Sequence, residues 1–242
     1  MKYSAKIFYT VLLLLITVIT FPSFSYALGF SDQVAEIRVG EDNHTIALVD
    51  ENTTISEYFE LFRKYVAEGK HDVSMLIFRT IISKNTEEAL KYIDKELQSN
   101  PQDPLLYYVK GELMFIEKKY EKSFECYERF LQLANELTGL KKELTADVYY
   151  SRGTALHYLR KYEQALESFD KAIEILPNFA AAYQNKGNVY KDLRKKEEAL
   201  KCYDTAISYQ PINADILFSK GNALYEFGMY EEALFVLNSA IK

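Results

Sequence analysis

The sequence predicts an all-α protein built from stacked helical hairpins, and three observations support this fold class. First, two stretches that lie 34 residues apart have nearly the same pattern: KYEQALESFDKAIEILP at 161–177 and KKEEALKCYDTAISYQP at 195–211. Second, the apolar residues of each stretch recur at the three- and four-residue spacing of an amphipathic helix. Third, the 242 residues include only nine Gly and five Pro, whereas the helix-favouring residues Ala, Leu, Glu and Lys are plentiful. A fixed period of this length is typical of repeat architectures.

The composition is that of a folded protein with a moderate negative charge. Hydrophobic residues make up 48% of the chain, charged residues make up 26%, and the formal net charge is −6 at pH 7. This length suits one or two ordinary domains or a single repeat array. Lys and Arg are interspersed with acids along the chain, whereas nucleic-acid binding needs a basic stripe that neutralises phosphates. We therefore expect no nucleic-acid partner.

The N-terminal residues 1–27 have the layout of a secretory signal peptide. Lys2 and Lys6 precede an uncharged, mostly apolar run at 7–21, and small residues follow up to Ala27. This order of regions predicts cleavage after Ala27. As a helix, the apolar run would reach about 22 Å, which is short of the about 30 Å of hydrocarbon in a bilayer. We expect an extracytoplasmic protein, periplasmic or secreted. The alternative is an uncleaved segment that keeps the protein at the membrane.

Residues 28–69 lie between the signal segment and the repeats, and we expect them to cap the array. The stretch EIRVGEDNHTIALV at 36–49 has the pattern of a small β-hairpin. An amphipathic helix is predicted after it, with Thr54 and Glu57 as an N-terminal capping box and Gly69 as the stop signal.

Small residues recur in register along the rest of the chain. The steps between them are 34 residues, except for one step of 42 that indicates an eight-residue insertion, placed at 138–145. Each unit has two helical stripes with a short polar turn between them, such as LRKY at 159–162, and Pro177 is typical of the residues that end the second helix. The glycine column is Gly111, Gly153, Gly187 and Gly221, and the second column is Ser123, Ala165, Ala199 and Ala233. The predicted units are 70–103, which is degenerate, and then 104–137, 146–179, 180–213 and 214–242.

These columns resemble the tetratricopeptide repeat (TPR) family, whose unit has an aromatic residue, then Leu-Gly, Tyr, Ala, Phe, Ala and Pro at fixed positions. Arg or Lys replaces the Leu before the glycine, and Tyr or Leu replaces the first aromatic residue. Neither departure threatens the fold, because Tyr packs similarly and a basic side chain can extend its charge to water. The resemblance implies a right-handed helical-hairpin solenoid that binds a peptide or a partner helix in a concave groove lined by the first helices. The matching residues of the third unit are Tyr149, Arg152, Gly153, Leu156, Ala165, Phe169, Ala172 and Pro177.

The resemblance also places the candidate binding residues on the groove side of the first helices. Residues spaced i, i+4 and i+7 share one helix face. Asn side chains can pair with a peptide backbone of any sequence, and aromatic rings hold apolar side chains. The alternative is that some of these rings only fill gaps between neighbouring repeats. The candidates are Tyr108, Glu112, Tyr150, Thr154, His157, Gln184, Asn188, Lys191, Phe218, Asn222 and Tyr225.

The last unit has Phe235 and Val236 where the earlier units have the pairs Glu-Cys, Glu-Ser and Lys-Cys. An outward-facing Phe suggests a surface that another molecule covers. We therefore predict docking or self-association through the final helix, which would give a homodimer. The alternative explanation is a chain that is shorter than its gene.

The sequence predicts no catalytic residues, no cofactor and no metal site. His44, His71 and His157 lack the spacing of metal ligands, and no phosphate-binding loop or nucleophile motif occurs. Cys126 and Cys202 would lie about 20 Å apart if each helix layer adds about 8–10 Å, so we expect no disulfide, which needs Cα atoms within about 7 Å. The predicted function is an extracytoplasmic interaction scaffold that is not an enzyme. The alternative function is a membrane-tethered accessory subunit of an envelope enzyme or transport complex.

Overall fold

The computed structural model of the chain describes residues 38–39, 44–45, 53–84, 86–134 and 142–240. The chain divides into a unit of residues 1–53 and a unit of residues 54–242, and each is considered by itself. The predicted signal segment lies outside the described residues. Among the helices in the described ranges, none combines the length and the apolar character that a membrane crossing requires.

The described part of the first unit is a short pairing of two strands. β1 (Arg38–Val39) and β2 (His44–Thr45) are antiparallel, with Arg38 opposite Thr45 and Val39 opposite His44. These two strands lie within the stretch predicted as a hairpin at 36–49.

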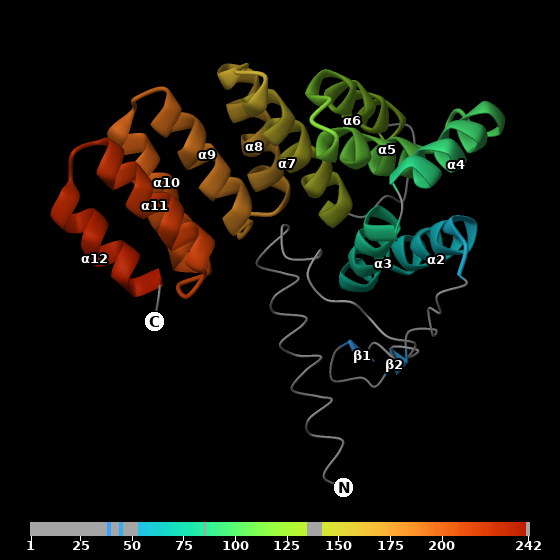
Figure 1. Ribbon diagram of the computed structural model, residues 1–242, viewed down its shortest axis with the longest axis horizontal. Coiled ribbons are helices and arrows are strands. Elements are labelled where there is room, and N and C mark those ends of the chain that lie inside the picture. Colours follow the sequence, from blue (N-terminus) through green and yellow to red (C-terminus); the bar gives the residue numbers. More distant parts are fainter. Residues whose placement is uncertain (1–37, 40–43, 46–52, 85, 135–141, 241–242) are drawn as a thin grey trace, which may run out of the picture. The chain divides into compact units, whose positions relative to one another are not determined.

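The described residues of the second unit form α-helices joined by short turns, and Figure 1 shows their order. α2 begins and ends as predicted, because Thr54 and Glu57 form a complete capping box and Gly69 ends the helix at a φ of 71°. The predicted all-α fold class of helical hairpins is therefore confirmed. The helices are α2 (Ile55–Glu68), α3 (His71–Lys84), α4 (Thr86–Ser99), α5 (Pro104–Ile116), α6 (Tyr120–Ala134), α7 (Lys142–Tyr158), α8 (Tyr162–Ile175), α9 (Ala180–Asp192), α10 (Lys196–Tyr209), α11 (Ala214–Glu226) and α12 (Tyr230–Ala240).

From α5 onward the helices pair as hairpins: α5 with α6, α7 with α8, α9 with α10, and α11 with α12. The second helix of each hairpin also packs against the first helix of the next one, so the hairpins stack in sequence order (Figure 1). α7 begins at Lys142, earlier than the unit predicted to start at 146. This extra turn buries Leu144, and the last part of the predicted insertion is therefore helical.

The N-terminal helices pair differently from the prediction. α3 and α4 span the degenerate unit predicted at 70–103, but α3 packs mainly against α2, which the sequence assigned to the cap. Aromatic rings explain this pairing, because the centroid of Phe62 in α2 lies 6.0 Å from that of Phe78 in α3. Phe59 of α2 also lies 5.0 Å from Tyr92 of α4. Through these rings α2 contacts both helices of the predicted unit, and the predicted boundary after Gly69 falls inside a packed hairpin.

Inside each hairpin from α5 to α12, a large side chain of the second helix covers the glycine of the first helix. A Cβ atom built on any of these glycines would lie 2.6–2.8 Å from the nearest atom of that side chain, a distance that real Cβ atoms do not adopt. The two helices therefore approach as closely as a bare Cα permits. The pairs are Gly111 with Tyr127, Gly153 with Phe169, Gly187 with Tyr203, and Gly221 with Leu237.

The turn inside each of these hairpins is a left-handed helix ending. In the α7–α8 turn, the N–H of Lys161 donates to the carbonyl of Leu156 at 2.9 Å, which is the Schellman arrangement. Residues other than glycine adopt a positive φ at a cost of about 1–2 kcal/mol, so the packing of the joined helices must outweigh this strain in three of the turns. The residues at positive φ are Lys118 (59°), Arg160 (58°), Arg194 (59°) and Gly228 (79°).

The basic residue before each glycine forms an ion pair with the second helix of the preceding hairpin, or with α4 in the case of α5. The acidic partners keep the repeat spacing as well. Partly exposed ion pairs of this kind contribute about 0–1 kcal/mol each to stability. Their main effect is that each first helix pairs one basic side chain with one acid of the helix before it. The pairs are Lys110–Asp94, Arg152–Glu128, Lys186–Asp170 and Lys220–Asp204.

The ring-on-glycine contact predicts unequal costs for the same substitution. Gly153→Ala should overpack the buried ring of Phe169, at a cost of about 1–3 kcal/mol. The gain in helix propensity is only about 1 kcal/mol, so the variant should be less stable than wild type. Gly221→Ala should cost less, because Leu237 is partly exposed and can rotate away. Thermal unfolding followed by circular dichroism measures both. Equal melting temperatures for wild type and Gly153→Ala would contradict the packing described above.

Candidate functional site

The candidate site is the face of α5, α7, α9 and α11 that bears the predicted binding residues, termed here the first-helix face. Its residues fall into two groups. On α5, α7 and α9 most of them contact the rest of the array, whereas on α11 the aromatic ones are exposed.

Tyr108 of α5 is a core residue and is not available to a partner. It is 2% exposed, its ring stacks on Phe78 at 5.1 Å, and it meets the ring of Phe130 at 6.1 Å. Its hydroxyl lies 3.8 Å from the sulfur of Met75. The prediction that Tyr108 contacts a ligand is wrong, because Phe78 of α3 covers its ring.

Glu112 of α5 is half-buried and accepts a hydrogen bond from the hydroxyl of Tyr127 at 2.7 Å. Burial raises the pKa of Glu112 above its usual value. The hydrogen bonds from Ser151 and Tyr127 lower this pKa, and the nearby carboxylate of Asp147 raises it. Asp147 itself lies 3.2 Å from Nε2 of His71. Glu112 is therefore an internal acid between hairpins rather than a freely exposed binding group.

Asn188 of α9 occupies the position that Glu112 has in α5. It accepts a hydrogen bond of 2.7 Å from the hydroxyl of Tyr203, and its Nδ2 donates to Oδ1 of Asn185 at 3.2 Å. The amide that was predicted to pair with a peptide backbone therefore already has partners within the array.

Polar residues of the next first helix engage the predicted residues of α7 and α9. Nδ2 of Asn185 donates to the hydroxyl oxygens of Tyr150 and Thr154, at 3.1 Å each. Nε2 of Gln184 donates to Oγ of Ser219 at 2.8 Å. Burial raises the pKa of Tyr150 to about 12. These bonds connect α7 with α9 and α9 with α11.

Sequence reasoning missed the residues that make these bonds. Ser151, Asn185 and Ser219 lie 34 residues apart, each one position after the predicted Tyr150, Gln184 and Phe218. Ser151 bonds to Glu112 of the preceding first helix, as Asn185 and Ser219 bond to theirs. The signal in the sequence was a polar residue that recurs with the repeat period inside a helix.

A histidine–carboxylate contact and an ion pair connect the C-terminal ends of the same first helices. Nε2 of His157 lies 2.8 Å from a carboxylate oxygen of Asp192, and Nζ of Lys191 lies 2.8 Å from Glu226. The side chains of His157 and Lys191 are each 20% exposed. On α7 and α9 the third predicted position is therefore also engaged with the neighbouring helix.

α11 presents its aromatic side chains at the surface. Phe218 is 57% exposed and Tyr225 is 65% exposed, and Asn222 lies between them on the same helix face. These residues form what is termed here the α11 stripe. The ring of Tyr225 lies 5.4 Å from the ring of Tyr230, the first residue of α12, so the exposed aromatic surface continues onto the last helix.

The predicted self-association residues lie on α12. Phe235 is 76% exposed and its neighbour Leu234 is 63% exposed, whereas Val236 is half-buried. Phe235 is thus an outward-facing ring.

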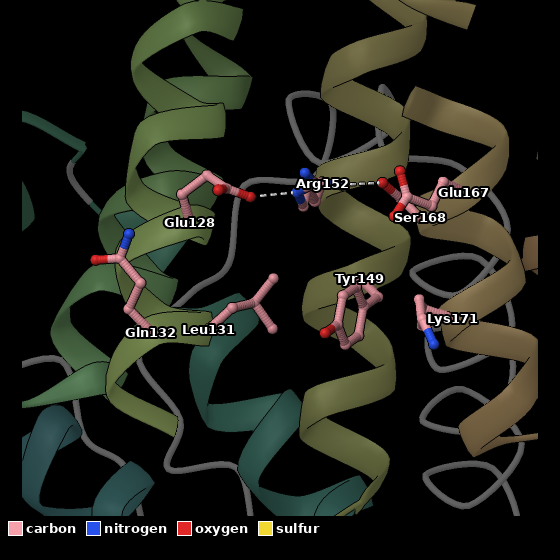
Figure 2. Close-up of a pocket in the computed structure, with 8 residues that line it drawn as sticks. All are labelled: Glu128, Leu131, Gln132, Tyr149, Arg152, Glu167, Ser168 and Lys171. Carbon is pink, nitrogen blue, oxygen red and sulfur yellow. Dashed lines mark hydrogen bonds and ion pairs between the residues drawn. The ribbon is translucent and has the colours of Figure 1, made fainter. Parts of the chain in front are cut away.

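A separate shallow cleft of about 270 Å³ lies among α6, α7 and α8. Figure 2 shows Arg152 at its centre, between Glu128 on one side and Ser168 on the other, with Tyr149 below. Nε of Arg152 lies 2.5 Å from Glu128, and the guanidinium also donates to Ser168. The central cation is therefore already paired, and the cleft does not include the predicted binding residues.

The cysteines of the described residues lie on α6 and α10. Cys126 and Cys202 are free. Burial raises the pKa of the Cys126 thiol to about 11, so this thiol is protonated at neutral pH and is a poor nucleophile. Within the described ranges, no group of three or more His, Cys, Asp or Glu side chains is arranged to hold a metal ion.

Comparison with known families and structures agrees with this architecture. Models of the tetratricopeptide repeat match residues 104–178, 180–213 and 202–235, which together make up more than half of the chain. The chain therefore belongs to the tetratricopeptide repeat family, whose members bind other proteins or peptides. Comparison with curated proteins gave no match.

Several solved structures share the fold. MamA from residue 41 to its end, from Desulfovibrio magneticus RS-1, is 17% identical, with 78% of this chain and 96% of that chain covered and a TM-score of 0.59. BtubC from P. vanneervenii is 17% identical, and the match covers 77% of this chain and 87% of BtubC with a TM-score of 0.59. YrrB is described as a TPR protein with an unusual peptide-binding site. It is 25% identical, and the match covers 74% of this chain and 90% of YrrB with a TM-score of 0.53.

The environment of Glu112 predicts a pH-dependent difference from a neutral variant. A carboxyl whose pKa is raised in the folded state stabilises the protein below its usual pKa and loses that contribution as the pH rises through the raised value. Glu112→Gln can still accept the bond from Tyr127, as Asn188 accepts it from Tyr203. The melting temperature of Glu112→Gln relative to wild type should therefore rise between about pH 4 and about pH 7.

The control for this measurement is Glu121→Gln, at an exposed position in the first turn of α6. Its difference from wild type should stay nearly constant over the same pH range. A Glu112→Gln variant that loses stability relative to wild type as the pH rises would contradict the effect of burial on Glu112.

Proposed function

We propose that this protein is an interaction scaffold that binds a partner protein or peptide through the α11 stripe. The exposure of Phe218 and Tyr225 is the observation that supports this site most strongly. The equivalent positions on α7 and α9 contact the adjacent first helix. Large exposed aromatic side chains on a rigid helix are typical anchors of protein interfaces.

The family supports the same function. TPR proteins bind other proteins or peptides, and YrrB, at 25% identity, is described as having a peptide-binding site. In this proposal the face on α7 and α9 is a rigid support, because its polar groups bond to neighbouring helices.

The compartment is part of the proposal. The segment before Ala27 supports an extracytoplasmic location after cleavage, either periplasmic or secreted. A membrane-tethered accessory subunit is the second candidate, which would retain this segment. The mass of the chain purified from its native source distinguishes them, because retention of Met1 favours tethering.

Site-specific photo-crosslinking tests the α11 stripe directly. A photoreactive phenylalanine analogue at position 218 or 225, in cells that express the chain natively, should crosslink to a partner. The same analogue at Tyr158, which is 58% exposed at the end of α7, should give a yield lower by about five-fold or more, because interface energy is concentrated in a few anchors. Equal yields at all three positions would contradict a binding site on α11.

A second candidate interaction is self-association through Phe235 and Val236. The 76% exposure of Phe235 favours it. Light scattering should show twice the monomer mass for wild type and the monomer mass for Phe235→Glu, because a charge in an apolar dimer contact is costly. Tyr209→Glu, at an exposed position on α10, should leave the mass of wild type unchanged. A monomer for both wild type and Phe235→Glu would rule out this dimer.

A further inference from the structure

We infer that one edge of the array binds an extended acidic segment of a partner protein. This edge consists of the turns α5–α6 (117–119), α7–α8 (159–161) and α9–α10 (193–195), and it is termed here the turn edge. It does not include the α11 stripe, so the inference does not depend on the proposed site. Three features support it: the charges of the turns, the positions that these charges occupy within the turns, and the way in which the turns adjoin one another.

The turn edge is strongly basic in a chain that is acidic overall. Its nine residues include six cations and one acid, a net charge of +5 (6 − 1), whereas the whole chain has a formal net charge of −6. Within the described ranges, ion pairs engage two of the six cations, Lys119 with Glu117 and Arg194 with Glu226. The cations are Lys118, Lys119, Arg160, Lys161, Arg194 and Lys195, and all six are exposed.

The first cation of each turn lies where a glycine would be less strained. Lys118, Arg160 and Arg194 have φ values of 58–59°, in the left-handed region that favours glycine. The equivalent turn between α11 and α12 has Gly228 at this position, with a φ of 79°. The three cations therefore reduce the stability of their turns, and strained residues of this kind are typical of functional sites.

The second cation of each turn directly precedes the second helix, where a cation is also unfavourable. Lys161 and Lys195 are the N-cap residues of α8 and α10, and neither forms a side-chain capping bond. Lys119 directly precedes α6 in the same way. Ser, Thr, Asp and Asn are the preferred N-caps, and the positive end of the helix dipole repels a cation. Two adjacent positions in each turn thus carry charge against local helix chemistry, which indicates a role other than folding.

Contacts with aromatic rings do not account for these cations. Nζ of Lys161 lies 5.6 Å from the ring centroid of Phe124. Nζ of Lys195 lies 6.0 Å from the ring centroid of Tyr190. At exposed positions such cation–π contacts are weak, so the folded chain itself supplies little attraction for the charges of the turn edge.

The three turns adjoin one another, so their cations form one surface. The ring of Tyr158, the last residue of α7, stacks on the ring of Tyr120, the first residue of α6, with a centroid distance of 4.7 Å. Nε2 of His157 lies 2.8 Å from a carboxylate oxygen of Asp192, the last residue of α9. Because helices in contact lie about 8–10 Å apart, successive pairs of cations follow one another at about this spacing.

This spacing and the neighbouring acids favour an extended acidic segment over a nucleic acid or a membrane. An extended chain advances about 3.3 Å per residue, so carboxylates at every third residue would meet successive pairs of cations. Glu121, Glu163 and Glu197 lie in the first turns of α6, α8 and α10. A dense array of phosphates would meet these acids as well as the cations, whereas spaced carboxylates need only the cations.

Two designed peptides of about ten residues test the inference, with either Glu or Gln at every third position and Ser and Gly elsewhere. Fluorescence anisotropy with the full chain should show that the Glu peptide binds at least about ten-fold more tightly than the Gln peptide. The affinity for the Glu peptide should fall as salt rises from about 50 to about 300 mM, because salt screens exposed charges.

Variants that suit the helix ends better should bind this peptide less tightly. Lys118→Gly with Arg160→Gly and Arg194→Gly should raise the melting temperature by at least about 2 °C, because glycine relieves the positive φ. The same variant should weaken the Glu peptide about five-fold or more. Lys161→Ser with Lys195→Ser supplies two N-caps and should also raise the melting temperature and lower the affinity. A purely structural role of these cations would leave the affinity unchanged.

Three exposed lysines elsewhere provide a matched control. Lys95→Gln with Lys171→Gln and Lys201→Gln, on α4, α8 and α10, lowers the net charge by the same three units as the glycine variant. The affinity of this control for the Glu peptide should stay within about two-fold of wild type, because its substitutions lie away from the turns.

Two results with the peptides would overturn the inference: equal binding of the Glu and Gln peptides, or a glycine variant that keeps the wild-type affinity. Vesicles with about 30% phosphatidylserine provide the third test. If they bind wild type but not the glycine variant, and the Glu peptide does not bind, a membrane surface is the occupant and the inference is wrong. None of these results bears on the α11 stripe. Because Tyr158 borders the turn edge, its crosslinking yield is compared only for the protein that positions 218 and 225 capture.

Discussion

In each hairpin from α5 to α12, a side chain of the second helix rests on the bare Cα of a glycine in the first helix. The rings of Tyr127, Phe169 and Tyr203 leave no room for a Cβ atom at these glycines. This close contact recurs with the sequence period, so successive hairpins have nearly the same internal geometry and can stack in register. The helices at each joint then meet through an ion pair at the same position.

This stacking decides which side chains are free to bind a partner. Because the first helices lie side by side, their polar groups bond to each other through Asn185, Ser219 and the pairs His157–Asp192 and Lys191–Glu226. These polar groups on α7 and α9 therefore help to hold neighbouring hairpins together. The aromatic residues of α11 occupy equivalent positions and are exposed, so the same geometry that makes α7 and α9 a support makes α11 the candidate contact surface.

The sequence predicted the features that depend on the period or on local chemistry. The glycine column, the hairpin pairs and the capping box at Thr54 follow from residue type and spacing alone. The pairing of α2 with α3 could not be predicted, because Phe62 and Phe78 lie outside the clear repeats and no period relates them. The burial of Tyr108 was missed for the same reason. Helix spacing identified the residues on the first-helix face, but whether each contacts a partner or the next helix depends on the residue opposite it.

The central claim is that equivalent first-helix positions are covered on α7 and α9 and open on α11. Single cysteines at positions 157, 191 and 225, in a chain with Cys126→Ser and Cys202→Ser, allow this to be measured as the rate of maleimide labelling under native conditions. The structure predicts that the cysteine at 225 reacts about ten-fold or more faster than the other two, because protection follows local burial. Equal rates at the three positions would contradict the stacking of the first helices and the open surface on α11.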